Sequence, residues 1–77
     1  MLPPQNLEAE QSALGCMMIT KKCALASKDF SVDDFYFTKH KPILEAIQEL
    51  VEEGQAVDLI TVTDKLTEQE KLGAELS

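Results

Sequence analysis

Apolar residues recur every three to four positions in the middle of the chain, which is the spacing of one helix face. This stripe predicts a helix over residues 38–53, with Thr38 as its N-cap and Gly54 as its C-terminal stop. Pro42 then falls at the end of the first turn, where one helical hydrogen bond is lost. The stripe consists of Ile43, Leu44, Ile47, Leu50 and Val51.

The N-terminal segment predicts an extended lead-in followed by a helix. Residues 1–5 contain two consecutive prolines, which keep this stretch out of a helix, and Asn6 is then a suitable N-cap. The apolar face of the helix carries Leu7, Leu14, Met17 and Met18. Gly15 lies inside this helix at a cost of up to about 1 kcal/mol relative to alanine. We therefore expect another helix to approach closely at this position.

Two short elements are expected before the central helix. Residues 20–29 form a short, weakly patterned helix, and Ser31 with Asp34 matches a capping box that predicts a single helical turn. The same region holds the four aromatic residues of the chain, Phe30, Phe35, Tyr36 and Phe37. Because an aromatic side chain buries about 150–250 Å², we expect these rings to fill the centre of the core.

The C-terminal third is ambiguous between strand and helix. Residues 57–63 are rich in β-branched side chains, which favours a strand. Asp58 is nevertheless a good helix cap, and the valines on either side of it stand where a hydrophobic staple would place them. We therefore expect a helix, followed by a last short helix that begins at a capping box at Thr67 and ends near Gly73.

Together these elements predict an all-α fold, a compact globule of about five short helices in a single domain over residues 1–77. The longest apolar run, residues 13–19, is far shorter than the roughly 20 residues of a membrane-spanning helix. The N-terminus also lacks the pattern of a signal peptide. These features predict a cytoplasmic chain without a membrane partner.

The charge balance argues against direct nucleic-acid binding. The chain has 14 acidic residues, 7 lysines and no arginine, for a net charge of −7. A net negative chain repels a polyanion, and arginine is the side chain best suited to bidentate phosphate contacts.

No catalytic, cofactor or metal site is expected in this chain. Its glycines are isolated and none precedes a lysine, unlike a phosphate-binding loop. Cys16, Cys23 and His40 match the spacing of no zinc module. We interpret the cysteines as reduced thiols in the core, with a disulfide as the alternative, and the histidine as partly exposed. The carboxylates lie on polar helix faces or at caps, so we expect all of them to be solvated.

Three sequence blocks resemble the N-terminal domain of hexameric replicative DNA helicases of the DnaB type. The first is PPQNLEAEQSALG at residues 3–15, and the second is DFY at residues 34–36 followed by His40 and Ile43. The third runs from EAIQEL at residues 45–50 through Gly54 to VDLITVT at residues 57–63. The resemblance spans about residues 3–66, and Pro42 and the two cysteines depart from the family pattern.

The resemblance implies a protein-interaction and assembly domain rather than an enzyme. In this family the domain helps to build a collar on the helicase ring. The implied partners are the C-terminal domain of primase, the helicase loader and neighbouring helicase subunits. ATP and magnesium belong to a motor domain that this chain lacks. The chain also stops before the helical hairpin that pairs two such domains in the family. We therefore expect a fragment of a longer helicase.

The candidate partner-binding residues are Tyr36, Lys39, His40 and Lys41. They combine an aromatic ring with positive charge at a helix start in the least acidic part of the chain. Alternatively, the tyrosine packs in the core and the lysines are merely solvated.

Two other functions remain open from the sequence. One is a small helical DNA-binding domain, and the other is a phage or plasmid decoy that mimics the collar domain and sequesters its partners. The open reading frame distinguishes the decoy from a helicase, because a helicase continues into a phosphate-binding loop.

Overall fold

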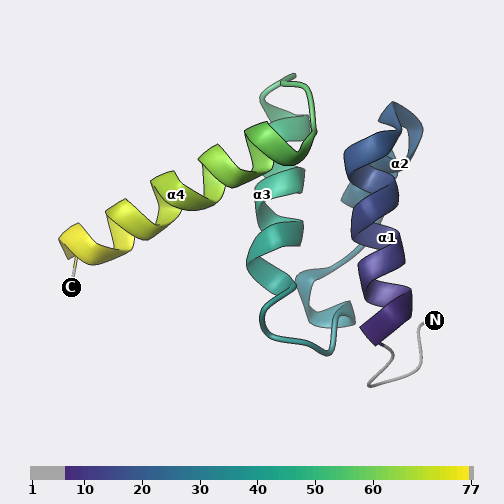
Figure 1. Cartoon of the computed structure of the whole chain (residues 1–77), viewed down its shortest axis with the longest axis horizontal. Helices are drawn as coiled ribbons and strands as arrows, with labels where there is room; N and C mark the ends of the chain where they lie inside the picture. The colour runs from purple at the N-terminus through teal and green to yellow at the C-terminus, as the bar shows by residue number, and fades with distance from the viewer. Residues whose placement is uncertain (1–6, 77) are drawn as a thin grey trace.

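The computed structural model describes residues 7–76, and the side chains of residues 7–71. Within this part of the chain all regular elements are helices, as predicted (Figure 1). They are α1 (Leu7–Ile19), α2 (Lys21–Ala26), the 3₁₀ turns η1 (Ser27–Asp29) and η2 (Val32–Asp34), α3 (Lys41–Glu52) and α4 (Leu59–Leu76). The expected lead-in at residues 1–5 and the Asn6 cap lie outside the described residues.

Helices α1, α2 and α3 form the body of the molecule, and α4 leaves the end of α3 and extends away from it (Figure 1). The C-terminal end of α4 therefore lies on the opposite side of the molecule from α1 and α2. No helix in the described part of the chain has the length and apolar character that crossing a bilayer requires.

Helix α3 is the centre of the core, because it supplies four of the eight residues of the buried cluster. The cluster consists of Leu14 and Met17 from α1, Phe35 from the segment after η2, the α3 residues Leu44, Ala46, Ile47 and Leu50, and Val62 from α4. Full burial of one large aliphatic side chain contributes about 1.5–3 kcal/mol. Three residues of the stripe read from the sequence, Leu44, Ile47 and Leu50, are buried, so α3 contributes more to the hydrophobic core than any other helix.

Helix α3 begins at Lys41 with His40 as its N-cap residue, so the predicted start at Thr38 is wrong. With Thr38 as the cap, Pro42 would occupy the first position whose N–H must bond back to the cap carbonyl. Starting at Lys41 moves Pro42 to the second helical position, where no intrahelical bond requires an N–H. The helix thus begins where its proline is compatible with the hydrogen-bond pattern.

Helix α4 is continuous, and the predicted break before Thr67 is wrong. Its start was predicted correctly: Asp58 Oδ1 accepts from the Thr61 N–H at 2.9 Å, and Thr61 Oγ1 accepts from the Asp58 N–H at 3.0 Å. The Thr67 hydroxyl instead donates to the Thr63 carbonyl at 3.0 Å within the helix. It therefore does not cap a new helix, and α4 runs through Gly73 to Leu76.

The aromatic residues fill the core only in part. Phe35 is buried, at 1% exposure, and Phe30 packs edge-on against it with ring centroids 6.2 Å apart. Phe30 and Phe37 are half-buried, and Tyr36 is 51% exposed. Extended backbone directs neighbouring side chains to opposite sides, so a buried Phe35 leaves Tyr36 outside.

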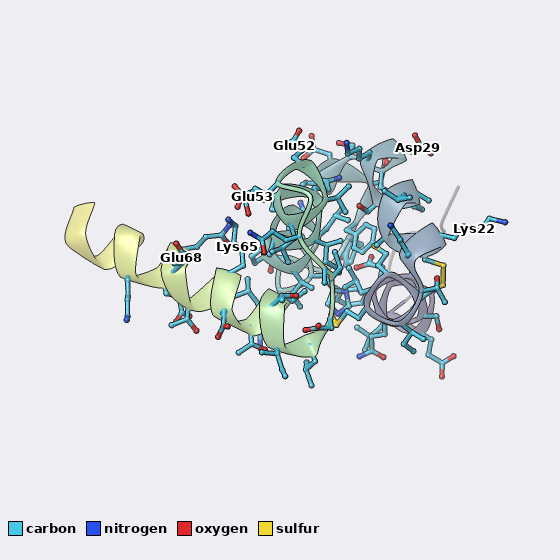
Figure 2. All side chains as sticks on the ribbon, turned by 90° about the horizontal axis from the view of Figure 1, so that it is seen from above. Lys22, Asp29, Glu52, Glu53, Lys65 and Glu68 are labelled. Carbon is cyan, nitrogen blue, oxygen red and sulfur yellow. A yellow bond between two sulfur atoms is a disulfide. The ribbon has the colours of Figure 1, made fainter. Side chains whose placement is uncertain are left out.

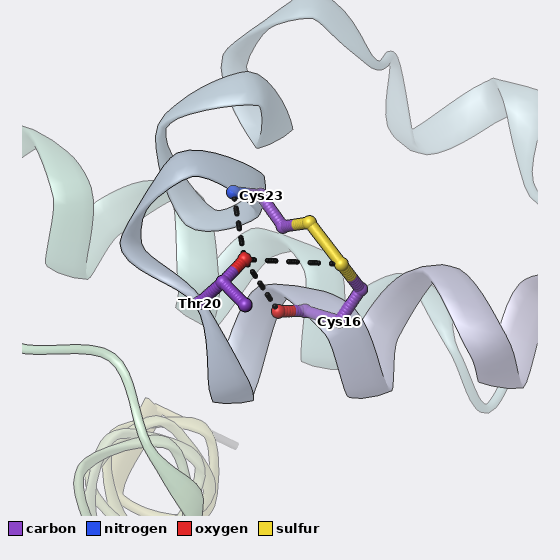
Figure 3. The surroundings of a disulfide bond; sticks show 3 residues. All are labelled: Cys16, Thr20 and Cys23. Atoms are coloured by element: carbon purple, nitrogen blue, oxygen red, sulfur yellow. Dashed lines mark hydrogen bonds between the residues drawn. A yellow bond between two sulfur atoms is a disulfide. The ribbon is translucent and has the colours of Figure 1, made fainter.

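Cys16 and Cys23 form a disulfide, so the interpretation of these residues as reduced thiols is wrong (Figure 3). Thr20 ends α1 and caps α2, which folds back along α1 and brings the two Cα atoms within 5.8 Å. The capping contact is the Thr20 hydroxyl, which accepts from the Cys23 N–H at 3.2 Å. The chain reversal, rather than the sequence spacing, places the two sulfur atoms together.

Gly15 and Gly54 have opposite roles. A Cβ at Gly15 would meet no atom within 4 Å, so the expected close helix approach is wrong. Gly54 has φ of +71°, in the left-handed region that favours glycine, and it follows the end of α3 as predicted.

Alanine substitutions should separate these roles. We expect Gly15→Ala to stabilise the chain by up to about 1 kcal/mol, because it removes backbone freedom without a clash. Gly54→Ala should destabilise it by about 1 kcal/mol or more, because a Cβ disfavours positive φ. Urea denaturation of both variants tests the assignment. Destabilisation by Gly15→Ala would contradict the open space at that position.

Candidate protein-interaction site

The segment between η2 and α3, residues 35–40, is called here the aromatic loop. It contains three aromatic residues and His40, and it carries most of the predicted partner-binding residues. Phe35 anchors the loop in the core beneath, whereas Tyr36 and Lys39 are exposed. The loop therefore presents an aromatic ring and a positive charge from a fixed base.

A carboxylate from α1 holds the aromatic loop in place. Glu10 Oε2 accepts from the Tyr36 N–H at 2.7 Å, and Glu10 Oε1 accepts from the Phe37 N–H at 3.3 Å. His40 Nδ1 lies 2.8 Å from Glu10 Oε1 and is the donor, because an ionised carboxylate only accepts. One side chain thus binds three donors that lie 26 to 30 residues away in sequence.

Glu10 is buried, at 1% exposure, yet its surroundings favour the charged form. Burial by itself raises the pKa of Glu10. The hydrogen bonds from His40, Tyr36 and Phe37, together with the charge of the imidazole, outweigh that effect and hold the pKa below its usual 4.5. The carboxylate is therefore a structural anion at neutral pH.

Contacts between aromatic rings connect the buried part of the aromatic loop with its exposed tyrosine. The Tyr36 and Phe37 rings meet edge to face with centroids 5.3 Å apart, and Phe37 packs on the His40 ring at 5.7 Å. The buried Phe35 ring lies 6.4 Å from the same imidazole. Packing of this kind restricts ring rotation, so the exposed tyrosine is held by its neighbours.

The four predicted partner-binding residues have different environments. Tyr36 and Lys39 are exposed, and Lys41 is half-buried at the first position of α3. The His40 side chain is 11% exposed and faces Glu10. The alternative in which the tyrosine packs in the core does not agree with its 51% exposure.

Sequence reasoning missed Glu10, and the expectation that all acidic side chains would be solvated is wrong for it. Glu10 precedes Leu14 by four positions and Met17 by seven, and both of these are buried. This spacing places the carboxylate on the core face of α1. A single charge within an apolar stripe was the signal available in the sequence.

A second surface feature is an apolar groove of about 470 Å³ between the α1–α2 junction and the connection from α3 to α4. Its walls are Ile19, Thr20, Lys21, Ala24, Leu25, Val51, Gly54, Gln55, Ala56 and Val57. Ile19 is 83% exposed and Leu25 is 54% exposed. The groove thus presents apolar side chains to solvent at the end of α1.

A third feature is an acidic cleft between α3 and α4, lined by Glu49, Glu52, Glu53, Lys65, Glu68 and Gln69. Lys65 Nζ bridges its two sides, 2.8 Å from Glu53 and 3.8 Å from Glu49 (Figure 2). The hydrogen bond to Glu53 raises the pKa of Lys65 above its usual 10.5. Among residues 7–71, no three histidine, cysteine or acidic side chains are grouped to hold a metal ion.

Comparison with known proteins assigns the family. The family model described as "DnaB-like helicase N terminal domain" matches residues 2–76. The chain belongs to the DnaB-like helicase N-terminal domain family. The resemblance and the all-α class predicted from the sequence are thereby confirmed.

Relatives of the DnaB-like family extend well beyond this chain. It is 43% identical over 72 residues to the replicative DNA helicase DnaC of Bacillus subtilis, covering 92% of this chain and 16% of the relative. It is 46% identical over 72 residues to the replicative DNA helicase DnaB of Leifsonia xyli, covering 92% of this chain and 15% of the relative. The chain thus spans about one sixth of the relatives' length.

The fold is also similar to a solved structure of the same family. The crystal structure of the N-terminal domain of DnaB helicase from Mycobacterium tuberculosis superposes with a TM-score of 0.81 at 34% identity. The match covers 90% of this chain and 49% of that chain. At this identity, the agreement supports common ancestry as well as a common fold.

Replacement of Glu10 should destabilise the DnaB-like domain. Glu10→Gln replaces one accepting oxygen by an NH2 group that can only donate and that would face N–H donors of the loop, so we expect a loss of about 1–3 kcal/mol at neutral pH. Glu8→Gln on the exposed side of the same helix is the control, with an expected change below about 0.5 kcal/mol. Urea denaturation measures both.

The pH dependence of the Glu10→Gln effect has a defined sign. Because the folded-state pKa of Glu10 is lowered, its contribution is present above the usual value of 4.5 and is lost as pH falls through the folded-state value. The stability difference between the wild-type chain and Glu10→Gln should therefore narrow below pH 4.5. A difference that stays constant would contradict a charged Glu10 anchor.

Proposed function

We propose that this chain is the protein-interaction and assembly domain of a hexameric replicative DNA helicase. Its proposed partners are the C-terminal domain of primase, the helicase loader and neighbouring helicase subunits. The observation that supports docking most directly is the aromatic loop, whose backbone is fixed by a buried carboxylate. Tyr36 and Lys39 are its proposed contact residues.

The physical basis of this proposal is preorganisation. Binding costs about 0.5–1.5 kcal/mol for each mobile side chain that becomes ordered. The Glu10 contacts and the ring packing restrict the loop before any partner arrives. Tyrosine is also enriched among residues that dominate binding energy at protein interfaces. A half-exposed tyrosine whose ring is packed against Phe37, on the same loop as an exposed lysine, therefore suits a partner that offers an apolar pocket and an acidic rim.

Truncation of the contact residues should weaken primase binding. We expect Tyr36→Ala to raise the Kd for the C-terminal domain of primase at least about tenfold, and Lys39→Ala about two- to fivefold. Isothermal titration calorimetry with primase from the same organism measures both values. His40 and Lys41 are tested separately, because removal of His40 also disturbs the Glu10 contact.

The matched control is Lys71→Ala, which removes one exposed lysine from α4. It should leave the Kd unchanged, and circular dichroism should show an intact fold for all variants. Equal affinity of the wild-type chain and Tyr36→Ala would exclude the aromatic loop as the docking site. Absence of binding by the wild-type chain would exclude primase as the partner.

Direct DNA binding is the competing proposal, and the charge disfavours it. A net charge of −7 repels the phosphates of DNA. Low ionic strength is the most sensitive condition for the test, because electrostatic forces between protein and DNA are least screened there. We expect no change in fluorescence anisotropy when labelled single-stranded or duplex DNA is titrated with the chain in low salt. Tight binding that weakens with added salt would favour the DNA-binding domain.

The proposed setting is a longer cytoplasmic polypeptide. The helical hairpin that pairs collar domains would follow this chain in that polypeptide, and ATP hydrolysis with magnesium would belong to a separate motor domain. The open reading frame separates this proposal from the decoy. A phosphate-binding loop downstream supports the helicase, and a stop codon directly after Ser77 supports the decoy.

A further inference from the structure

The disulfide lies at the surface of the junction between α1 and α2. Cys16 and Cys23 are both half-buried, and neither belongs to the fully buried cluster. The Thr20 hydroxyl lies between them, 3.5 Å from the Cys16 carbonyl and 3.9 Å from the Cys16 sulfur (Figure 3). A small thiol can therefore reach this bond without entry into the core.

The same junction is the positively charged part of an acidic chain. Residues 11–28 contain three lysines and no acidic residue, although the whole chain has a net charge of −7. Lys21 and Lys22 directly precede Cys23, and both are exposed. Lys22 projects from the surface at the same end of the molecule as the sulfur–sulfur bond (Figure 2). An anionic reactant is thus attracted to the surface around the disulfide.

We propose that Cys16 and Cys23 form a reversible thiol–disulfide site that reacts with small anionic thiols and disulfides of the glutathione class. Disulfides in reducing compartments are usually transient and redox-sensing, which agrees with the cytoplasmic setting proposed above. The site goes beyond the docking function, because it uses neither the aromatic loop nor Glu10.

The exchange is a balanced two-electron reaction. In the oxidising direction, one cysteine thiolate attacks a sulfur of glutathione disulfide, whose S–S bond breaks and releases one glutathione thiolate. The second cysteine thiolate then attacks the protein sulfur of the mixed disulfide and releases the second glutathione. The two protons lost by the cysteines end on the two glutathione thiols. Reduction by two glutathione molecules reverses each step.

The redox state of this site determines how firmly one wall of the apolar groove is held in place. Ile19, Thr20 and Lys21 lie between the two cysteines in sequence and line the groove. Ala24 and Leu25 follow Cys23 directly and line it too. Reduction removes the covalent tie that holds α2 against the end of α1, and this wall is then held only by the Thr20 cap, backbone hydrogen bonds at the junction and the packing of α2, which buries Ala24. The opposite wall, from α3 and the loop after it, is unaffected.

The first test is a redox titration of the 77-residue chain with mixtures of reduced and oxidised glutathione. Acid quenching, alkylation and mass spectrometry report the fraction of disulfide. We expect this fraction to change with the glutathione ratio and to reach the same value from the oxidised and the reduced side. A bond that persists in a large excess of reduced glutathione would overturn the proposal, as would thiols that never pair under oxidised glutathione.

The second test concerns the charge. Lys22→Glu should slow oxidation by glutathione disulfide about two- to fivefold and leave the rate with neutral hydroxyethyl disulfide unchanged. Lys71→Glu makes the same change in net charge near the far end of α4. It should have no such effect on either rate. Equal rates for the two variants with glutathione disulfide would overturn the proposed attraction.

The third test concerns the groove. Amide hydrogen exchange over residues 19–25 should rise about tenfold on reduction, whereas exchange over α3 should stay constant. The double variant Cys16→Ser/Cys23→Ser should behave like the reduced chain at every glutathione ratio. Unchanged exchange over residues 19–25 would show that the bond does not control the groove, and it would overturn that part of the proposal.

Discussion

The structure depends on one buried carboxylate and the three donors that surround it. The Glu10 contacts connect the first turn of α1 with the segment that leads into α3. Desolvating an ion is costly, so such a group is stable only where its hydrogen bonds are complete. The contact therefore fixes three things together: the position of α1, the course of the aromatic loop and the start of α3.

Helix α1 is tied to the rest of the molecule by different means at its two ends. Near its N-terminus the tie is ionic, from Glu10 to the aromatic loop, and near its C-terminus it is covalent, from Cys16 to α2. Between them, Leu14 and Met17 pack in the core. The proposed docking loop thus contacts the beginning of α1, and the proposed redox site lies at its end. The two sites share no residue.

The sequence predicted those features that depend on local spacing. The α3 stripe, the Ser31–Asp34 box and the start of α4 at Asp58 follow from neighbours within one or two turns. The Glu10 contact did not, because its partners lie 26 to 30 residues away and meet it only after folding. The disulfide likewise depends on the reversal at Thr20. Thr67 was read as a cap because its alternative bond to Thr63 exists only inside a continuous helix.

The projecting helix α4 has a mechanical consequence. Its 18 residues correspond to a rod about 27 Å long at 1.5 Å per residue. The rod meets α3 near its base, where Lys65 bridges the two helices. Eleven residues of α4 lie beyond Lys65, so a tilt of about 10° at this pivot moves the far end of the rod by about 3 Å. Loss or gain of one ion pair at Lys65 would therefore change the tilt of α4 relative to α3. The resulting displacement would be largest at the C-terminal end of α4.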